Sequence, residues 1–354
     1  MALDMAGCPN RCRHCYLGYL PTRRVDGAEL REVVARLRAW VRPGEAAPYL
    51  RHVQAHTWFR EPDYRPDYRA LYDLERELSG REPARFELLS IWRLARDPDY
   101  AAWARRIGTE ACQVTFFGLE VTHDWFVRRR GSFQDSLVAT ERLLEAGIRP
   151  RWQIFFTQHI LPELDALYAL VDRLRLRERC EALGGPFQVF LHTPCPDGEA
   201  IGIEGLRPTV SALARVPAEL LTASVAHIGR PLGEAEADIV ARLRRCAEPA
   251  ATRWGSAERL GFYVTSRLDV YTNLADLHPW WRLGNLARED VGTIIRRLED
   301  GDTIGFRVLR EVPLSTLAER YGRPRGRRLY TEGDLVSCWV LLESRRRWAL
   351  NSEA

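Results

Sequence analysis

Short apolar runs alternate with longer amphipathic segments from the start of the chain to about residue 200. The short apolar runs predict strands. The amphipathic segments place apolar residues at helical spacing, and several close on a glycine, as a helix C-terminus favours. The six predicted strands span 2–6, 49–57, 85–91, 112–118, 151–157 and 187–193, and the helices between them span 28–40, 69–80, 99–108, 133–147 and 161–180.

This alternation is typical of successive βα units around a parallel sheet, and six such units predict an α/β fold with a partial (β/α)6 TIM-like barrel. The pattern changes after the sixth strand, where a Pro- and Gly-rich stretch predicts a loop. We expect the barrel in 1–205, a helical connection in 206–260 and a third domain in 261–354. The later predicted elements are a loop over 194–209, helices over 210–221, 234–247, 289–301 and 313–322, and a strand pair within 261–273.

With 354 residues, 46% of them hydrophobic and 28% charged, the chain can bury a large core. It contains no lysine, which excludes a Schiff-base lysine and the lysine of a phosphate-binding loop. The net charge is +4, and the basic runs at 128–130, 323–328 and 345–347 lack an aromatic-rich binding motif. We interpret these runs as solvated faces and expect no nucleic-acid partner.

The eight cysteines are scattered outside one N-terminal cluster, in a chain too large to need disulfide bonds for stability. Residues 1–7 lack the basic start and apolar run of a signal peptide, and no stretch approaches the ~20 apolar residues of a membrane span. We therefore expect reduced cysteines, a cytoplasmic location and no membrane partner.

The N-terminal cluster reads CPNRCRHC and contains Cys8, Cys12 and Cys15. An odd number of cysteines cannot pair among themselves, and these spacings are too short for a disulfide framework. Three thiolates can hold three corners of a [4Fe-4S] cluster and leave one iron open. A structural zinc site would need a fourth ligand, for which His14 is poorly placed. The cluster therefore favours an open iron-sulfur site.

This CxxxCxxC motif, in the loop after the first predicted strand, resembles that of the radical S-adenosylmethionine (radical SAM) enzymes. The resemblance implies that S-adenosylmethionine binds the open iron and is cleaved reductively to a 5′-deoxyadenosyl radical, which abstracts a hydrogen atom from the substrate. It also implies a reductant such as flavodoxin or ferredoxin. The competing hypothesis is a noncatalytic iron-sulfur protein with a structural or redox-sensing role.

Further segments resemble the cofactor-binding motifs of that family. In 58–68, Glu61 stands in the GGEP-like turn that holds the methionine amino group, although both glycines are replaced. In 114–133, Thr115, His123 and Asp124 match a pattern after the fourth strand, and Arg130 is the arginine expected to contact the ribose or carboxylate. His14 matches the position that supports the adenine, which the loop 192–200 also borders.

The segment 269–290 resembles the strand-turn-strand of a SPASM/twitch-type accessory domain, with Asn273 in the expected cysteine area and therefore without auxiliary clusters. Such domains are found in peptide-modifying members, whereas the start of the chain close to the motif leaves no room for a leader-peptide recognition domain. Two hypotheses for the substrate therefore stay open. One is a peptide that is matured or epimerised; the other is a small molecule in natural-product biosynthesis that undergoes dehydration, epimerisation, oxidation or decarboxylation. Cys195 is the candidate thiol for returning a hydrogen atom to the substrate.

Overall fold

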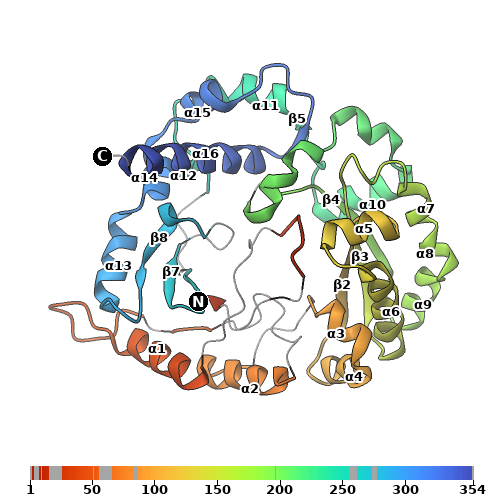
Figure 1. Ribbon diagram of the computed structural model, residues 1–354, viewed down its shortest axis with the longest axis horizontal. Coiled ribbons are helices and arrows are strands. Elements are labelled where there is room, and N and C mark those ends of the chain that lie inside the picture. Colours follow the sequence, from red (N-terminus) through yellow and green to blue (C-terminus); the bar gives the residue numbers. More distant parts are fainter. Residues whose placement is uncertain are drawn as a thin grey trace.

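The computed structural model describes residues 2–3, 8, 10–15, 26–50, 52–55, 66–82, 87–195, 197–254, 261–272 and 277–352. Helices lie around the outside of the molecule, and its two larger sheets lie on opposite sides within that ring (Figure 1). The three-stranded sheet is at the right of the view, and β7 and β8 are at the left. The fold is therefore of the mixed α/β class.

The three-stranded sheet consists of β2 (Ala111–Phe116), β3 (Arg149–Phe155) and β4 (Gln188–His192) in that order. All three strands are parallel, as predicted for 112–118, 151–157 and 187–193. Along β2 and β3, buried side chains alternate with half-buried ones. One face thus packs under the helices, while the other carries polar side chains such as Gln113, Thr115 and Gln153.

The second sheet has the order β1 (Ala2–Leu3), β6 (Tyr263–Val264), β7 (Asp269–Tyr271) and β8 (Arg282–Asn285). β1 is parallel to β6, whereas β6, β7 and β8 form antiparallel pairs, which confirms the strand pair predicted within 261–273. A further antiparallel pair joins β5 (Glu234–Ala235) to β9 (Leu329–Tyr330).

Two predicted strands are wrong in the described residues. In 49–57, the backbone N–H and carbonyl of Ala55 bond to the Ser79 hydroxyl, so a helix side chain takes the place of a neighbouring strand. In 85–91, the Glu87 carbonyl accepts one bond from Gln113 of β2, but Ser90 then caps a helix. Residues 4–6 of the first predicted strand lie outside the described residues.

The predicted helices over 28–40, 69–80, 99–108, 133–147, 289–301 and 313–322 are confirmed within one or two residues at most ends. The predicted helix 161–180 is divided into three, because Ala169 and a left-handed Arg175 interrupt it. The predicted loop 194–209 contains a 3-10 helix. The helices are α1 (Gly27–Ala39), α2 (Tyr68–Ser79), α3 (Ile91–Arg96), α4 (Pro98–Arg106), α5 (Glu120–Val127), α6 (Ser132–Glu145), α7 (Leu164–Tyr168), α8 (Leu170–Arg173), α9 (Leu176–Ala182), α10 (Ala218–Ile228), α11 (Glu236–Leu243), α12 (Ala251–Trp254), α13 (Val291–Asp300), α14 (Ile304–Glu311), α15 (Leu314–Tyr321) and α16 (Glu332–Ser352), and the 3-10 helices are η2 (Gly198–Leu206), η3 (Val210–Arg215) and η4 (Pro279–Trp281).

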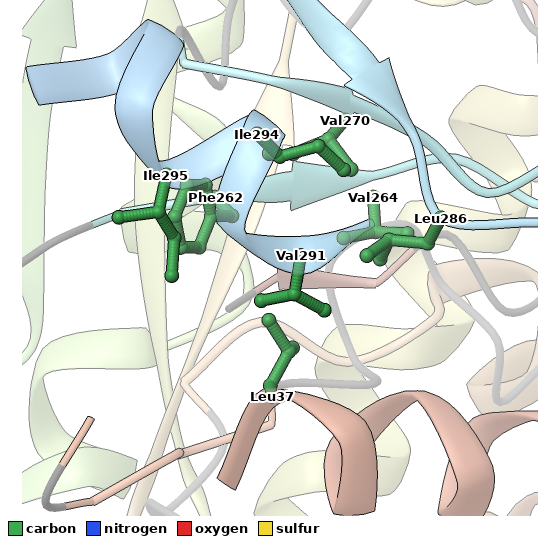
Figure 2. A pocket seen from close by; sticks show the side chains of 8 residues that line it. All are labelled: Leu37, Phe262, Val264, Val270, Leu286, Val291, Ile294 and Ile295. Carbon is green, nitrogen blue, oxygen red and sulfur yellow. The ribbon is translucent and has the colours of Figure 1, made fainter. Parts of the chain in front are cut away.

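Separate hydrophobic clusters stabilise different parts of the ring. The largest lies between the three-stranded sheet and its covering helices, and another unites α11 with α14, α15 and α16. A third brings α1 and α2 against β6–β8 and α13, so distant parts of the sequence share one core. Leu37 of α1 faces Val291 of α13 across a small cavity there (Figure 2). At about 10 Å³ and with apolar side chains around it, this cavity does not suit a water molecule.

No helix among the described residues is long and apolar enough to cross a membrane.

Candidate active site

The carboxyl ends of the three parallel strands meet at one edge of the sheet, where aromatic side chains collect. Phe117 directly follows β2, Phe155 ends β3, and His192 ends β4 in register with Phe155. The rings of Phe155 and His192 have centroids 5.7 Å apart, and those of Phe117 and Phe155 are 5.2 Å apart. Ligands and catalytic groups commonly gather at this end of parallel strands. We therefore expect a ligand-binding or catalytic site at this edge of the sheet.

The cysteine loop lies against this edge. The N–H of Arg13 donates to the Phe126 carbonyl on α5 at 2.8 Å, and the N–H of Glu199 after β4 donates to the Cys15 carbonyl at 2.9 Å. Cys12 packs against a small cluster that includes Phe117 and Phe155. The structure thus brings together three segments that the sequence predicted as one site: the cysteine loop, the exit of the 112–118 strand and the loop after 187–193.

His14 sits on the aromatic edge. Its ring centroid is 4.3 Å from that of Phe117 and 5.0 Å from that of Phe155. Burial, with smaller contributions from His192 and His123, lowers the pKa of His14 to about 3, so the ring is neutral at physiological pH. Its Nδ1 atom is buried without a hydrogen-bond partner among the described residues. A buried polar atom of this kind marks a place where a ligand can bind.

The turn from β2 into α5 is held by Glu163. Its carboxylate accepts hydrogen bonds from the Leu119 N–H and the Thr122 hydroxyl, both at 2.6 Å. Gly118 in this turn has φ +137°, and an added Cβ would lie 2.5 Å from the Glu163 carboxylate. Only glycine therefore fits the turn that sets the position of Phe117. Glu163 leaves no signal in the sequence, because it lies 44 positions beyond its partner Leu119.

His123 and Asp124, which match the family pattern by spacing, serve the local structure. His123 is only 2% exposed and lies behind Phe117, and its burial lowers its pKa to about 3. Asp124 accepts bonds from the Gly131 N–H, the Ser132 hydroxyl and the Phe133 N–H at 2.5–3.0 Å. Burial would raise the pKa of Asp124, but these three bonds outweigh it and lower the value. Together these contacts fix the tight connection from α5 to α6.

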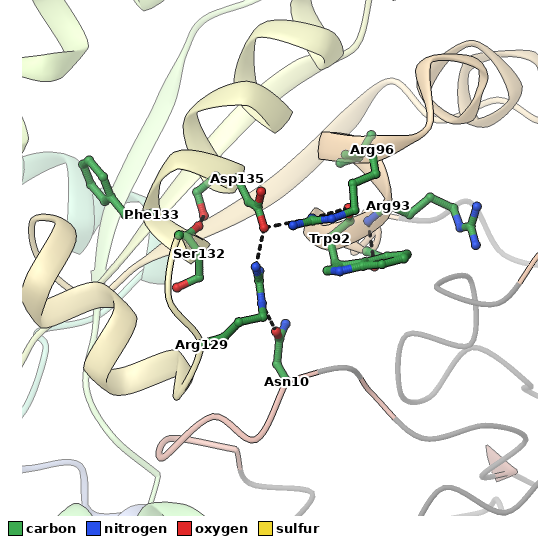
Figure 3. A network of polar contacts seen from close by, with 12 residues as sticks. Asn10, Trp92, Arg93, Arg96, Arg129, Ser132, Phe133 and Asp135 are labelled. Carbon is green, nitrogen blue, oxygen red and sulfur yellow. Dashed lines mark hydrogen bonds and ion pairs between the residues drawn. The ribbon is translucent and has the colours of Figure 1, made fainter.

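The three consecutive arginines after α5 occupy different surroundings. Arg128 pairs with Glu199 at 3.1 Å. Arg129 donates to the side-chain oxygen of Asn10 in the cysteine loop and also pairs with Asp135 of α6 (Figure 3). Arg130, the arginine predicted to contact the cofactor, is exposed. Among the described residues, Arg129 is thus the arginine of this run with a hydrogen bond to the cysteine loop.

Thr115 lies two residues before Phe117, on the polar face of the sheet. Its hydroxyl donates to the Gln153 side-chain oxygen at 3.0 Å, and Gln113 donates to the same oxygen at 2.6 Å. Arg151 of β3 continues this polar row and bonds to Gln113 at 3.3 Å. The row leads along the sheet to the aromatic edge.

Glu61, the residue predicted for the methionine amino group, lies outside the described residues.

Cys195 also lies at this edge, three residues beyond the end of β4. Its Sγ atom is 3.8 Å from Nε2 of His192. Burial raises the pKa of the thiol to about 12, and the carboxylates of Asp334 and Asp197 add to the rise, while Arg207 opposes it. Cys195 is therefore a protonated thiol at physiological pH. Asp334 belongs to α16, so the C-terminal helix borders the same edge.

The donor set of the cysteine loop suits an iron-sulfur cluster. Cys8, Cys12 and Cys15 are half-buried, and none of the eight cysteines, all of which the structure describes, forms a disulfide. No three His, Cys, Asp or Glu side chains of the described residues converge to hold a single metal ion. A [4Fe-4S] cluster does not require this convergence, because each thiolate binds a different iron. Three thiols in one half-buried loop thus fit such a cluster.

Comparison with known proteins identifies the fold. No family model matches the sequence, and no curated protein matches it. The structure of native anSMEcpe with bound AdoMet aligns over 99% of this chain and 98% of its own, with a TM-score of 0.52 and 11% identity. The same protein with AdoMet and the Cp18Cys peptide aligns with a TM-score of 0.52 at 12% identity. SuiB from Streptococcus suis bound to the precursor peptide SuiA has a TM-score of 0.42 at 11% identity.

anSMEcpe is an anaerobic sulfatase maturase of the radical SAM class. The chain therefore has the fold of a radical SAM enzyme over nearly its whole length.

Proposed function

We propose that this protein is a radical SAM enzyme that holds a [4Fe-4S] cluster through Cys8, Cys12 and Cys15, binds S-adenosylmethionine beside it, and abstracts a hydrogen atom from its substrate. The main support is the position of the cysteine loop, which hydrogen-bonds both to α5 and to the segment after β4 at the carboxyl edge of the parallel sheet. A loop of three thiols at that edge places the cluster where ligands of parallel sheets bind. We also propose a partial barrel, the domain division at 205 and 260, and a cytoplasmic location.

The chain's own residues would prepare the site in distinct ways. The bound cluster and S-adenosylmethionine supply the radical chemistry, and the protein contributes orientation and a dry pocket. His14, neutral and packed against Phe117 with its ring tilted, presents an imidazole ring on the aromatic edge, with an Nδ1 that has no partner among the described residues. This position is consistent with the predicted support of the adenine. The predicted roles of Glu61, Thr115 and Arg130 toward S-adenosylmethionine remain part of the proposal.

Among substrates, we favour a peptide over a small molecule. The support is that anSMEcpe, which aligns with this chain along almost its full length, has been solved with a bound peptide. The antiparallel pairing of β7 with β8 is consistent with the accessory-domain resemblance of 269–290. The setting of that reaction in natural-product biosynthesis is part of the same proposal.

We further propose that Cys195 returns a hydrogen atom to the substrate radical. A hydrogen-atom donor must carry its proton, and burial at the edge of the site keeps this thiol in the S–H form. Transfer breaks the S–H bond and forms a C–H bond, which leaves a thiyl radical that an external thiol or reductant must reduce. His192, at 3.8 Å, orients the thiol.

Anaerobic reconstitution with iron and sulfide tests the cofactor assignment. We expect about four irons and four sulfides per chain, and an electron paramagnetic resonance signal after dithionite reduction that changes when S-adenosylmethionine is added. An unchanged signal would favour a structural or redox-sensing cluster. About eight irons would indicate an auxiliary cluster, against the assignment of 261–354 as a domain without one.

A further inference from the structure

Arg207 is a fully buried cation beside the candidate active site. It directly follows η2, and its side chain is 0% exposed. Removal of a guanidinium from water destabilises a fold unless hydrogen bonds and an opposite charge compensate for it. The Glu204 carboxylate supplies that charge at 3.3 Å, and the guanidinium carbon lies 4.0 Å from the centroid of the Tyr330 ring. An apolar side chain would avoid the desolvation penalty, so the hydrogen bonds of this guanidinium point to a task beyond packing.

The guanidinium joins two segments that are far apart in the sequence. Its Nη1 donates to the Leu329 carbonyl of β9 at 3.1 Å, and its Nη2 donates to the Pro194 carbonyl after β4. The carboxylate of Asp334 on α16 lies 3.9 Å from the same Nη1. The N–H groups of arginine form a flat, rigid fork, so the directions of these bonds are set together. Arg207 thus fixes the segment after β4 against β9 and α16.

The bond to Pro194 sets the position of the next residue, Cys195. A peptide unit is planar, so the Pro194 carbonyl and the N and Cα atoms of Cys195 lie in one plane. Before this point, the segment is held by the Phe156 N–H, which donates to the His192 carbonyl at 2.7 Å. Beyond it, the Glu199 N–H bonds to the cysteine loop at 2.9 Å. Arg207 therefore holds the segment between these two anchors, directly before the residue that carries the thiol.

We propose that Arg207 is a positioning residue that holds the Cys195 thiol at the carboxyl edge of the parallel sheet, in reach of the reacting carbon atom. This inference rests on the proposed function, in which that thiol donates a hydrogen atom. Arg207 itself exchanges neither a proton nor an electron. Through its contacts to β9 and α16, the C-terminal part of the chain supports the thiol.

Alkylation of Cys195 by iodoacetamide tests this role without radical chemistry. Burial raises the pKa of the thiol, so the full-length wild type should react slowly at about pH 8. Arg207→Lys keeps the charge but loses the fork that reaches both carbonyls, so it should raise the rate about tenfold or more, measured by mass spectrometry of the Cys195 peptide. Arg36→Lys is the matched control, because Arg36 on α1 also donates to two carbonyls, those of Leu286 and Glu289. Its Cys195 should react as in the wild type.

Reaction without substrate in deuterium oxide tests the position of the thiol in the reconstituted enzyme. The 5′-deoxyadenosyl radical takes a deuterium atom from the exchanged S–D group of Cys195, which forms a C–D bond, breaks the S–D bond and leaves a thiyl radical. Dithionite supplies the electron that reduces the thiyl radical, and the solvent returns the deuteron. Water itself does not donate the atom, because its O–H bond is stronger than the C–H bond formed. The deuterium content of 5′-deoxyadenosine therefore reports whether the thiol is in reach.

Arg207→Lys should form 5′-deoxyadenosine at close to the wild-type rate but with a deuterium content about fivefold lower or less, because hydrogen transfer depends steeply on position. Cys195→Ala should give 5′-deoxyadenosine without this deuterium, and Arg36→Lys should match the wild type. A wild-type alkylation rate or a wild-type deuterium content in Arg207→Lys would overturn the positioning role. Wild-type 5′-deoxyadenosine free of deuterium would overturn it too.

Tyr330→Leu provides a second variant if Arg207→Lys does not fold. It removes the ring beneath the guanidinium, so it should raise the alkylation rate and lower the deuterium content by about twofold or more. Unchanged values in a folded Tyr330→Leu would overturn the positioning role. If the wild type made no 5′-deoxyadenosine with dithionite, the proposed function itself would fail, whereas the alkylation rates would still show whether Arg207 holds Cys195.

Discussion

The guanidinium of Arg129 donates a 2.7 Å hydrogen bond to the side-chain oxygen of Asn10, which ties the turn after α5 to the cysteine loop. Arg129 is held in turn by Asp135 of α6, and Asp135 also binds Arg96 of α3 at 2.9 Å (Figure 3). The loop that carries the three thiols is thus anchored, through one chain of polar contacts, to two helices that cover the parallel sheet.

Loss of this anchor should affect the cluster site, whereas loss of the next arginine should not. Arg129→Ala removes hydrogen bonds from a charged group, so we expect the free energy of unfolding to fall by about 1.5–3 kcal/mol and iron loading to decrease. Arg130→Ala changes an exposed side chain and should alter stability by less than about 0.5 kcal/mol. Its predicted contact with S-adenosylmethionine implies a Kd raised about ten- to a hundredfold, measured by equilibrium binding. Normal iron loading by Arg129→Ala would contradict the anchoring role.

The sequence predicted the strands at 112–118, 151–157 and 187–193 because each is a compact apolar run flanked by clear helical periodicity. The strands at 49–57 and 85–91 failed for a physical reason. Only Val53 and Ala55 are buried among the described residues of 49–57, and a serine side chain from α2 satisfies the backbone there. Ser90 converts the end of 85–91 into a helix cap. Such long-range hydrogen bonds leave no periodic pattern in the sequence.

The turn at Gly118 gives a second prediction. Gly118→Ala combines a left-handed backbone with a clash against Glu163 and Thr122, so it should lower the free energy of unfolding by about 3 kcal/mol or more. Gly44→Ala is the matched control, because Gly44 also has a positive φ of +86° but no atom within 4 Å of an added Cβ. Gly44→Ala should lower the free energy of unfolding by about 1–2 kcal/mol, measured by urea denaturation. Equal losses in both variants would mean that Glu163 does not restrict the turn.

Glu343 on α16 predicts an acid-sensitive part of the fold. It is buried and binds Arg320, Arg346, Arg347 and the Tyr321 hydroxyl. Burial would raise the pKa of this carboxyl, but these bonds outweigh it and hold the pKa well below its usual range. The stabilisation is therefore complete above the ordinary glutamate pKa near 4.5 and is lost as the pH falls below that value.

Glu343→Gln should lower the free energy of unfolding by about 3 kcal/mol at neutral pH, because it leaves the arginines without their shared carboxylate. Its unfolding free energy should also depend less on pH below about 4.5 than that of the wild type. Glu319→Gln, at an exposed position of α15, serves as the control and should retain wild-type behaviour. An identical pH dependence in the wild type and Glu343→Gln, followed by chemical denaturation, would rule out this role.

For Cys195, we expect Cys195→Ala to form 5′-deoxyadenosine at the wild-type rate but to release no product. In deuterium oxide, the wild type should incorporate one deuterium at a single carbon, because the thiol exchanges its proton with solvent. Mass spectrometry of the product measures both effects. The control is Cys180→Ala, which should still release product, because Cys180 is fully buried in the main core and away from the candidate site. Full product formation by Cys195→Ala would exclude the thiol as donor.

Only part of the candidate site could be predicted from the sequence. The CxxxCxxC spacing identified the thiols, and the strand ends identified the segments that meet them. The spacing of His123 and Asp124 matched a cofactor motif; in the structure His123 accepts from the Phe117 N–H after β2, and Asp124 holds the connection from α5 to α6. Glu163 and Arg129 could not be chosen from the sequence, because their partners Leu119 and Asn10 lie 44 and 119 positions away.

Formation of 5′-deoxyadenosine is the most direct test of radical SAM activity. After anaerobic reconstitution, the wild type with dithionite and S-adenosylmethionine should produce 5′-deoxyadenosine and methionine in equal amounts, as measured by liquid chromatography and mass spectrometry. Cys8→Ala, Cys12→Ala and Cys15→Ala should each lose the brown chromophore and this product together, whereas Cys246→Ala should retain both. A reconstituted wild type that yields no more 5′-deoxyadenosine than the Cys12→Ala variant would contradict the proposed function.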